Sequence, residues 1–241
     1  MKAVDNSGTA IGFVCKDGVI LAVEKILHSK LLVPGTNRRV HAIDDHVGLA
    51  AAGLVTDARK LVKQARKEAA DWRTYYNEPV PPKVLAERVA AFTQMYTLYY
   101  SLRPFGCSLL IASSVDVIEG GDSSSEMRDA PARRRKPVLY TVDPSGACTG
   151  VFAAAVGKGR QAAKTELEKL LPLASNSLDC RNALVQAAKV LLTVHDDTKD
   201  KQFEIEMSWI SESTDWKTEI VPDDLREAAI AEAKQMIAAA Q

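Results

Sequence analysis

The sequence is poor in the residue patterns that build metal centres and disulfide frameworks. Its histidines show no i, i+4 or HExxH spacing and there is no CxxC pair, so we expect no metal site and no cofactor. The cysteines lie far apart, mostly inside apolar segments, which is typical of small buried side chains in a reducing compartment. The residues concerned are His28, His41, His46, His195, Cys15, Cys107, Cys148 and Cys180.

An excess of charge and long apolar runs are also missing. The 31 Lys and Arg residues balance 31 Asp and Glu residues, so the whole chain is not drawn toward nucleic acid or an anionic membrane. Its apolar runs are far shorter than the roughly 20 residues of a membrane-spanning helix, and the N-terminus lacks the apolar core of a signal peptide. We expect a soluble intracellular protein without nucleic-acid or membrane partners.

The segment Thr9–Ile26 is the clearest local pattern that is present. Two apolar runs flank Lys16-Asp17-Gly18, and Asp-Gly between strand-like segments predicts a β-hairpin. The second run is almost continuously apolar, which indicates a central strand covered on both faces. With 46% hydrophobic residues in 241, the chain can build a sizeable core around this hairpin, and we expect one large domain.

The remaining chain predicts strands and pairs of helices in turn. Consecutive helix pairs argue against a parallel sheet built of βαβ units. They favour an α+β fold in which two antiparallel sheets pack face to face, each covered by a helix pair: a four-layer αββα sandwich. The expected strands are 40–43, 46–52, 107–117, 138–142, 150–156, 203–210 (an edge-type strand) and 219–221; the expected helices begin near Thr56, Pro82, Lys158, Ser177 and Pro222, and the third ends at Pro172.

Three motifs allow a chemical interpretation beside a structural one. Cys107 could be a thiol nucleophile served by His195, or a buried structural cysteine, which we favour. Gly157–Arg160 leads into a helix and could hold an anion, but it lacks P-loop spacing, so a surface turn is favoured. The run Arg133–Lys136 could be a nuclear-import or polyanion patch, or a solvated cluster beside Glu126 and Asp129 in a flexible surface insertion, 119–137.

Several segments together resemble the α-type subunits of the 20S proteasome, and the resemblance spans nearly the whole chain. They are GTAIGFVCKDGVILAVEK, GLVTDAR, YTLYYSLRPFGCS, YTVDPSG and VGKGRQAAKTELEKL, in family order. RPFGCS and VHDDTKDKQFEIEMSWI are most similar to the α subunits called type 3 in one nomenclature and placed seventh in the ring in another. The family fold is the Ntn-hydrolase αββα sandwich, which agrees with the predicted layers.

The resemblance implies that the catalytic residues of related β subunits are missing. Those relatives use an N-terminal threonine whose own amino group is the base. Here the nucleophile position falls at Gly8, inside a continuing chain, and the nitrogen of the neighbouring Thr9 is an amide. The acidic partner position corresponds to Glu24, and the lysine position falls at Arg39–Val40.

By resemblance, the chain is a non-catalytic subunit of a threonine-protease complex. Its implied roles are ring assembly, substrate gating and activator docking, in ATP- and ubiquitin-dependent protein degradation in cytoplasm and nucleus. The implied partners are the other α subunits of a heteroheptameric ring, the β subunits, and the C-terminal tails of a regulatory particle or activator. The tail pocket would include Arg39, Gly53 and Leu54, with arginine in place of the family's lysine.

Two points remain open beside this interpretation. The single α-type domain, 1–241, begins inside the first helix of the family. Either the N-terminal tail and part of that helix are missing by truncation at an internal methionine, which we favour, or the N-terminus is natively short and the subunit contributes little to the gate. The alternative function is a self-standing Ntn-type amidohydrolase, in which processing would expose Ser7 or Thr9 as a new N-terminal nucleophile.

Overall fold

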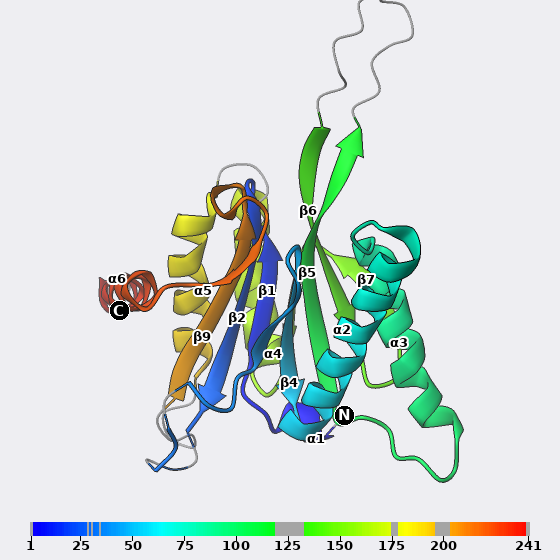
Figure 1. Ribbon diagram of the computed structural model, residues 1–241. Helices are drawn as coiled ribbons and strands as arrows, with labels where there is room; N and C mark the ends of the chain where they lie inside the picture. The colour runs from blue at the N-terminus through cyan, green and yellow to red at the C-terminus, as the bar shows by residue number, and fades with distance from the viewer. Residues whose placement is uncertain are drawn as a thin grey trace, which may run out of the picture.

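The computed structural model describes residues 2–27, 29, 31–33, 35–118, 133–174, 178–195 and 203–239. Two five-stranded antiparallel sheets lie face to face between two helical layers (Figure 1). The helices in these ranges are α1 (Lys2–Asp5), α2 (Val55–Tyr76), α3 (Pro82–Leu98), α4 (Arg160–Ala174), α5 (Cys180–Val194) and α6 (Asp223–Ala239). The strands are β1 (Ala10–Val14), β2 (Gly18–Ile26), β3 (Val40–Asp44), β4 (Val47–Gly53), β5 (Cys107–Ile118), β6 (Arg133–Val142), β7 (Cys148–Val151), β8 (Ala153–Val156), β9 (Phe203–Ser211) and β10 (Thr218–Ile220).

The predicted hairpin lies at the centre of the first sheet, whose strand order is β10-β9-β2-β1-β8. β1 and β2 pair antiparallel across the turn, with Val14 opposite Val19. Eight of the nine residues of β2 are buried, because the second sheet covers one of its faces and helix α5 the other. The prediction of a central strand is confirmed.

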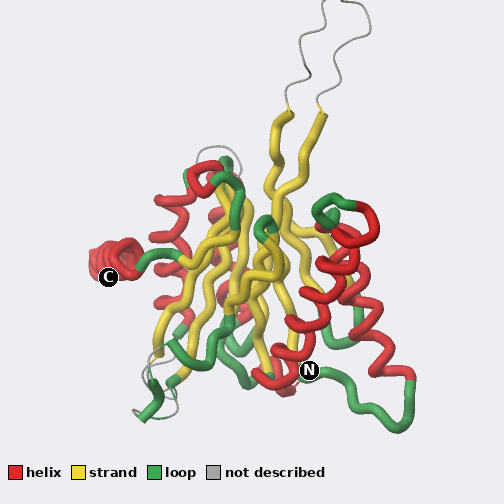
Figure 2. Tube along the Cα trace, in the orientation of Figure 1, coloured by secondary structure: helices red, strands yellow, loops and turns green. Residues whose placement is uncertain are grey.

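Three apolar layers explain the four-layer architecture, which confirms the predicted sandwich. One layer joins the first sheet to α4 and α5, a second joins the other sheet (β3-β4-β5-β6-β7) to α2 and α3, and a third fills the space between the sheets. Figure 2 shows the helices outside and the strands inside, and α6 packs on α5 rather than on a sheet. A sheet whose two faces are both covered needs apolar residues on both, as β2 and β4 have.

Two strand predictions and one loop prediction need correction. The expected strand 150–156 is two strands in different sheets, because the chain crosses between the sheets at Phe152. β9 is not an edge strand along its whole length, since the short β10 pairs with its outer side at Ser208–Ile210. The expected loop 119–137 is a strand from Arg133 onward, paired with β5 throughout; residues 119–132 lie outside the described ranges.

The predicted helix ends also need correction. Helix α2 begins at Val55, so Leu54 rather than Thr56 is its N-cap. Helix α4 continues past position 172 to Ala174. Helix α5 begins at Cys180, and Ser177 lies outside the described ranges. Within those ranges, no helix has both the length and the apolar character needed to cross a membrane.

Candidate functional site

The candidate site is the end of the sandwich where α1 meets the start of β1. Gly8 lies there, inside a chain that continues upstream: the Ser7 amide donates to the Val4 carbonyl oxygen at 3.0 Å. A Cβ added at Gly8 would lie 2.1 Å from the carbonyl oxygen of Glu24, closer than real Cβ atoms come to any neighbour. The Gly8 carbonyl is itself packed against Gly157, where a Cβ would lie 2.5 Å from it. The position has no room for a side chain of any kind.

The neighbouring polar groups are bonded to one another. The Thr9 amide donates to Glu24 Oε2 at 2.9 Å, and the Thr9 hydroxyl oxygen accepts from the Gly159 amide at 3.1 Å. The other carboxylate oxygen of Glu24 lies 2.6 Å from His195 Nδ1, and both side chains are about 95% buried, with exposed fractions of 5% and 4%. The ring of Phe203 stacks on His195 at 3.9 Å. We call Gly8, Thr9, Glu24 and His195 the closed slot.

The turn Gly157–Arg160 closes the slot from the other side. The Lys158 amide donates to the Ser7 carbonyl oxygen at 3.0 Å, and the Gly159 amide is the donor to Thr9. The Arg160 guanidinium lies 3.3 Å from the Asp5 carboxylate. Amides that could have held an anion at the start of α4 are thus bonded to the chain itself, which agrees with the favoured interpretation of a turn.

The structure brings Arg39 and Gly53 together, as the resemblance predicts. Arg39 Nη1 donates to the Gly53 carbonyl oxygen at 2.6 Å, and the Arg39 amide donates to Glu206 Oε2 at 2.9 Å. Burial lowers the pKa of the Arg39 guanidinium, against the opposing effect of the Glu206 charge, and burial raises the pKa of Glu206. Gly53 has φ of +120°, and a Cβ there would lie 2.2 Å from the Gly106 carbonyl oxygen, so only glycine fits. Leu54 follows and is 44% exposed.

A bidentate ion pair fixes the loop beside this corner. Both terminal nitrogens of Arg103 donate to the Asp57 carboxylate at 2.7 Å, and the Gly106 amide donates to the same carboxylate at 2.8 Å. The Arg103 guanidinium therefore holds the pKa of Asp57 below its usual value, although burial acts in the opposite direction. This arrangement explains the structural use of the RPFG segment: it ties the chain after α3 to the first turn of α2.

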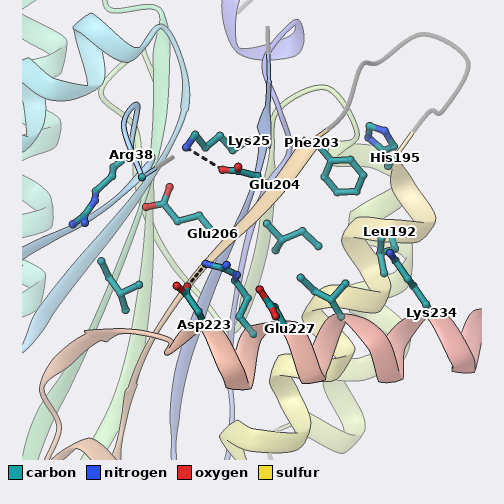
Figure 3. Close-up of a pocket in the computed structure, with 15 residues that line it drawn as sticks. Lys25, Arg38, Leu192, His195, Phe203, Glu204, Glu206, Asp223, Glu227 and Lys234 are labelled. Carbon is teal, nitrogen blue, oxygen red and sulfur yellow. Dashed lines mark hydrogen bonds and ion pairs between the residues drawn. The ribbon is translucent and has the colours of Figure 1, made fainter. Parts of the chain in front are cut away.

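A cavity of about 730 Å³ lies between β9, α5 and α6, beside Glu206 and His195. Figure 3 shows acidic and basic side chains mixed around it. Two ion pairs join these charges: Lys25 to Glu204 at 3.2 Å and Arg226 to Asp223 at 2.7 Å. Since its lining carries as many acidic as lysine and arginine side chains, the cavity favours no ligand of one charge.

Cys107 is a poor candidate nucleophile. It is 1% exposed, and burial, followed by the charge of Asp57, raises the pKa of its thiol to about 12. Its proposed base, His195, contacts Glu24 in the other half of the molecule instead. A thiol with such a pKa is almost entirely protonated at neutral pH. In the part of the chain that the structure describes, no group of three His, Cys, Asp or Glu side chains could hold a metal ion.

Comparison with known proteins decides the family. Residues 4–122 and 131–210 match the family described as "Proteasome subunit". The chain belongs to the proteasome subunit family. It is 45% identical over 236 residues to "Proteasome subunit alpha type-3" of Dictyostelium discoideum, covering 98% of this chain and 87% of that relative. It is 48% identical over 236 residues to the protein of the same name from Acanthamoeba castellanii, covering 98% and 85%.

A third relative, "Probable proteasome subunit alpha type-7" of Saccharomyces cerevisiae, is 42% identical over 231 residues, 95% of this chain and 74% of that relative. The predicted resemblance to α-type subunits of types 3 and 7 is confirmed, and the sandwich is the proteasome family fold. Because the relatives carry the names of proteasome α subunits, the alternative of a self-standing amidohydrolase is not favoured.

The sequence predicts three residues of the closed slot but not the contacts that fill it. Gly8, Thr9 and Glu24 were named from the resemblance, and Arg39, Gly53 and Leu54 as a tail pocket that stays a prediction. The bond between His195 and Glu24 was missed, since they lie 171 positions apart. The only available signal was that a histidine ends an apolar helix just before the strand that pairs with β2.

Proposed function

We propose that the chain is a non-catalytic α-ring subunit of the 20S proteasome core particle and contributes to ring assembly and substrate gating in protein degradation. The observation that carries the proposal is the closed slot in a member of this family. A threonine-protease subunit of this fold needs a hydroxyl and a free amine at one residue. Gly8 supplies neither, and the space around it admits no substitute.

The proposed partners are the neighbouring α subunits of a heteroheptameric ring, the β subunits, and activator tails. Exposed apolar side chains at the C-terminal end of α3 support a protein interface. Leu98 is 71% exposed, Tyr99 58%, and Tyr100 fully exposed. Large apolar side chains gathered along the surface are typical of contact regions between subunits.

Activator tails would bind at the corner formed by Arg39, Gly53 and Leu54. The support is local: a guanidinium suited to a carboxylate lies beside a half-exposed leucine. Because one guanidinium nitrogen is already bonded to the Gly53 carbonyl, a tail carboxylate would have to use the remaining donors. We also propose that the subunit works in cytoplasm and nucleus, which epitope tagging and cell fractionation would test.

Native mass spectrometry of the protein purified from its own cells tests the main proposal. We expect the chain in a large particle of stacked rings together with other α-type and β-type subunits, because head-to-tail contacts between like subunits close into rings. A free monomer, or a particle built from this chain without β-type subunits, would contradict it. For the pocket, Arg39→Ala should weaken activator binding to the particle, whereas Arg59→Ala on the outer part of α2 should not.

A further inference from the structure

A groove of about 360 Å³ lies at the end of the sandwich opposite the closed slot. Three segments line it: the turn after β1 with Lys16, the paired ends of β5 and β6 with Val117 and Lys136, and the crossing between β7 and β8 with Phe152. In Figure 1 the ends of β5 and β6 project from the sandwich as a two-stranded ribbon, away from α1. We call this the basic groove.

Strand pairing sorts the basic run of β6 onto two faces. Arg134 lies opposite Val117, and Arg135 opposite Asp116, so alternate residues point to opposite sides of the ribbon. Arg135 forms an ion pair across the ribbon, in which its Nε donates to Asp116 Oδ1 at 3.1 Å. Lys136 and Arg134 share a face, and that face carries the apolar Val117. The sequence run RRRK therefore becomes a mixed basic and apolar face rather than a uniform charge cluster.

The charged side chains that line the groove are all cations. They are Lys16, Arg134, Arg135 and Lys136, and none of the described acidic residues contributes to the lining. Among the described residues, the ammonium groups of Lys16 and Lys136 have no side-chain or carbonyl partner. Asp17, the nearest acid along the chain, is used elsewhere: its Oδ1 accepts from the Cys180 amide at 2.9 Å. Two exposed ammonium groups of the groove, those of Lys16 and Lys136, thus have no counter-charge among the described residues.

The groove also has an exposed apolar side. Phe152 is 67% exposed and Val117 is 38% exposed. The backbone holds Phe152 firmly at this place, because its carbonyl oxygen accepts from the Val14 amide at 2.8 Å. An exposed aromatic ring beside cations offers apolar surface that a partner's apolar side chain can bury.

We propose that the basic groove binds an acidic peptide segment of a partner protein, one that carries an apolar side chain among its carboxylates. Carboxylates would pair with Lys16 and Lys136 while the apolar side chain covers Phe152. The chain as a whole has no net charge, and the apolar Phe152 and Val117 lie among the cations of the groove, so a ligand with an apolar side chain fits better than a uniform polyanion. The backbone of the run is hydrogen-bonded to β5, so it is not a free peptide segment that a nuclear-import receptor could bind. This inference is independent of ring membership.

Fluorescence anisotropy with the full chain tests the proposal. The probe is a fluorescein-labelled decapeptide in which glutamates flank two phenylalanines; its comparison probes replace the glutamates by glutamine, or the phenylalanines by glycine. We expect Lys16→Gln/Lys136→Gln to weaken binding about tenfold, the effect of losing two exposed ion pairs. Phe152→Ala should weaken it about fivefold or more through lost apolar burial. The matched control Lys63→Gln, which removes an exposed lysine of α2, should leave the affinity unchanged.

Each outcome decides for or against the groove. Preference for the probe with both glutamate and phenylalanine, lost on Lys16→Gln/Lys136→Gln and weakened by salt, supports it. Equal binding by the double variant and the control would overturn it. Binding of an RNA oligonucleotide as tight as that of the peptide, with no effect of Phe152→Ala, would also overturn it, because it would show a simple polyanion patch.

Discussion

The two ends of the sandwich use their polar groups in opposite ways. At the closed slot, Thr9, Glu24 and His195 are bonded to one another or to the backbone and are nearly fully buried. At the basic groove, Lys16 and Lys136 face water without a partner among the described residues. Both ends are built from the same β1–β2 hairpin. The same hairpin therefore has bonded, buried polar groups at one end and exposed lysines, unpaired among the described residues, at the other, where we propose that it binds a partner.

The difference has an energetic consequence. A buried polar cluster stabilises the fold only while every member keeps its partner, so removing one is expensive. Exposed cations contribute little to stability because water and salt screen them. We therefore expect substitutions to change stability strongly at the slot and not at the groove.

The largest effect is expected for Glu24→Leu. The change removes at once the acceptor of the buried Thr9 amide and the carboxylate that lies 2.6 Å from His195 Nδ1. We expect the free energy of unfolding, measured by urea titration of the full chain, to fall by about 3–5 kcal/mol. Glu219→Leu, at an exposed position of β10, is the matched control and should change it little. A small effect of Glu24→Leu would show that the slot is not a connected unit.

Gly8→Ala is expected to lower the free energy of unfolding slightly less. Its Cβ would meet the Glu24 carbonyl at 2.1 Å, so the backbone of β2 or of the turn at Gly157 must move. We expect a loss of about 3 kcal/mol, typical of overpacking a tight core. Gly150→Ala is the control, since a Cβ there would make only an ordinary contact of 3.4 Å with Tyr140. Equal stability of the two variants would mean that the slot can open to hold a side chain.

Asp57→Ala tests the ion pair beside the slot end. We expect the free energy of unfolding to fall by about 2 kcal/mol at neutral pH. This value is at the low end for a carboxylate that accepts several hydrogen bonds, because the Arg103 side chain is 65% exposed and water screens its charge. The pKa of Asp57 is lower in the folded chain than in the unfolded one. Its stabilisation is therefore present above the unfolded pKa of about 4 and is lost as the pH falls through the folded pKa.

Urea titrations of the wild type and of Asp57→Ala at several pH values check this sign. The difference between the two proteins should be constant near neutrality and shrink below about pH 4. A difference that grows on acidification would contradict the assigned cause of the shift, since it would mean that the protonated carboxyl is the better bonded form.

The smallest effect on stability is expected at the groove. Lys16→Gln/Lys136→Gln should leave the urea midpoint unchanged, because neither ammonium has a partner among the described residues. The same double variant should lose binding to the acidic peptide, so stability and binding separate at this end. A marked loss of stability would place these lysines in the scaffold and remove the contrast between the two ends.

Local patterns in the sequence predicted the layers of the fold well. The Asp17-Gly18 turn and the apolar runs beside it fix the hairpin, and helix pairs between strand groups indicate the sandwich. Patterns failed where long-range pairing decides. Arg133–Pro137 is polar enough for a loop, yet it is held as a strand by its ladder with β5. Phe152 lies in a continuous strand-like run, yet the chain changes sheets there.

In the candidate site, too, local features were predictable from the sequence and long-range contacts were not. The absence of a nucleophile at Gly8 follows from the residue itself, whereas the lack of space around it depends on the Glu24 carbonyl and Gly157. No spacing rule connects Glu24 with His195, because α5 and β2 meet only in the folded chain. Similarly, the sequence shows that the run Arg133–Lys136 is basic. That Phe152 and Lys16 lie beside it follows only from the fold.

Mass spectrometry of the chain within the purified particle tests the central claim most directly. The particle is first treated with an electrophilic peptide probe that reacts with N-terminal threonine, and the intact mass of each subunit is then measured. We predict that the β-type subunits gain the probe, while this chain gains none and keeps the residues preceding Thr9. A chain that has lost its first six or eight residues, so that Ser7 or Thr9 is N-terminal, and that carries the probe would contradict the account.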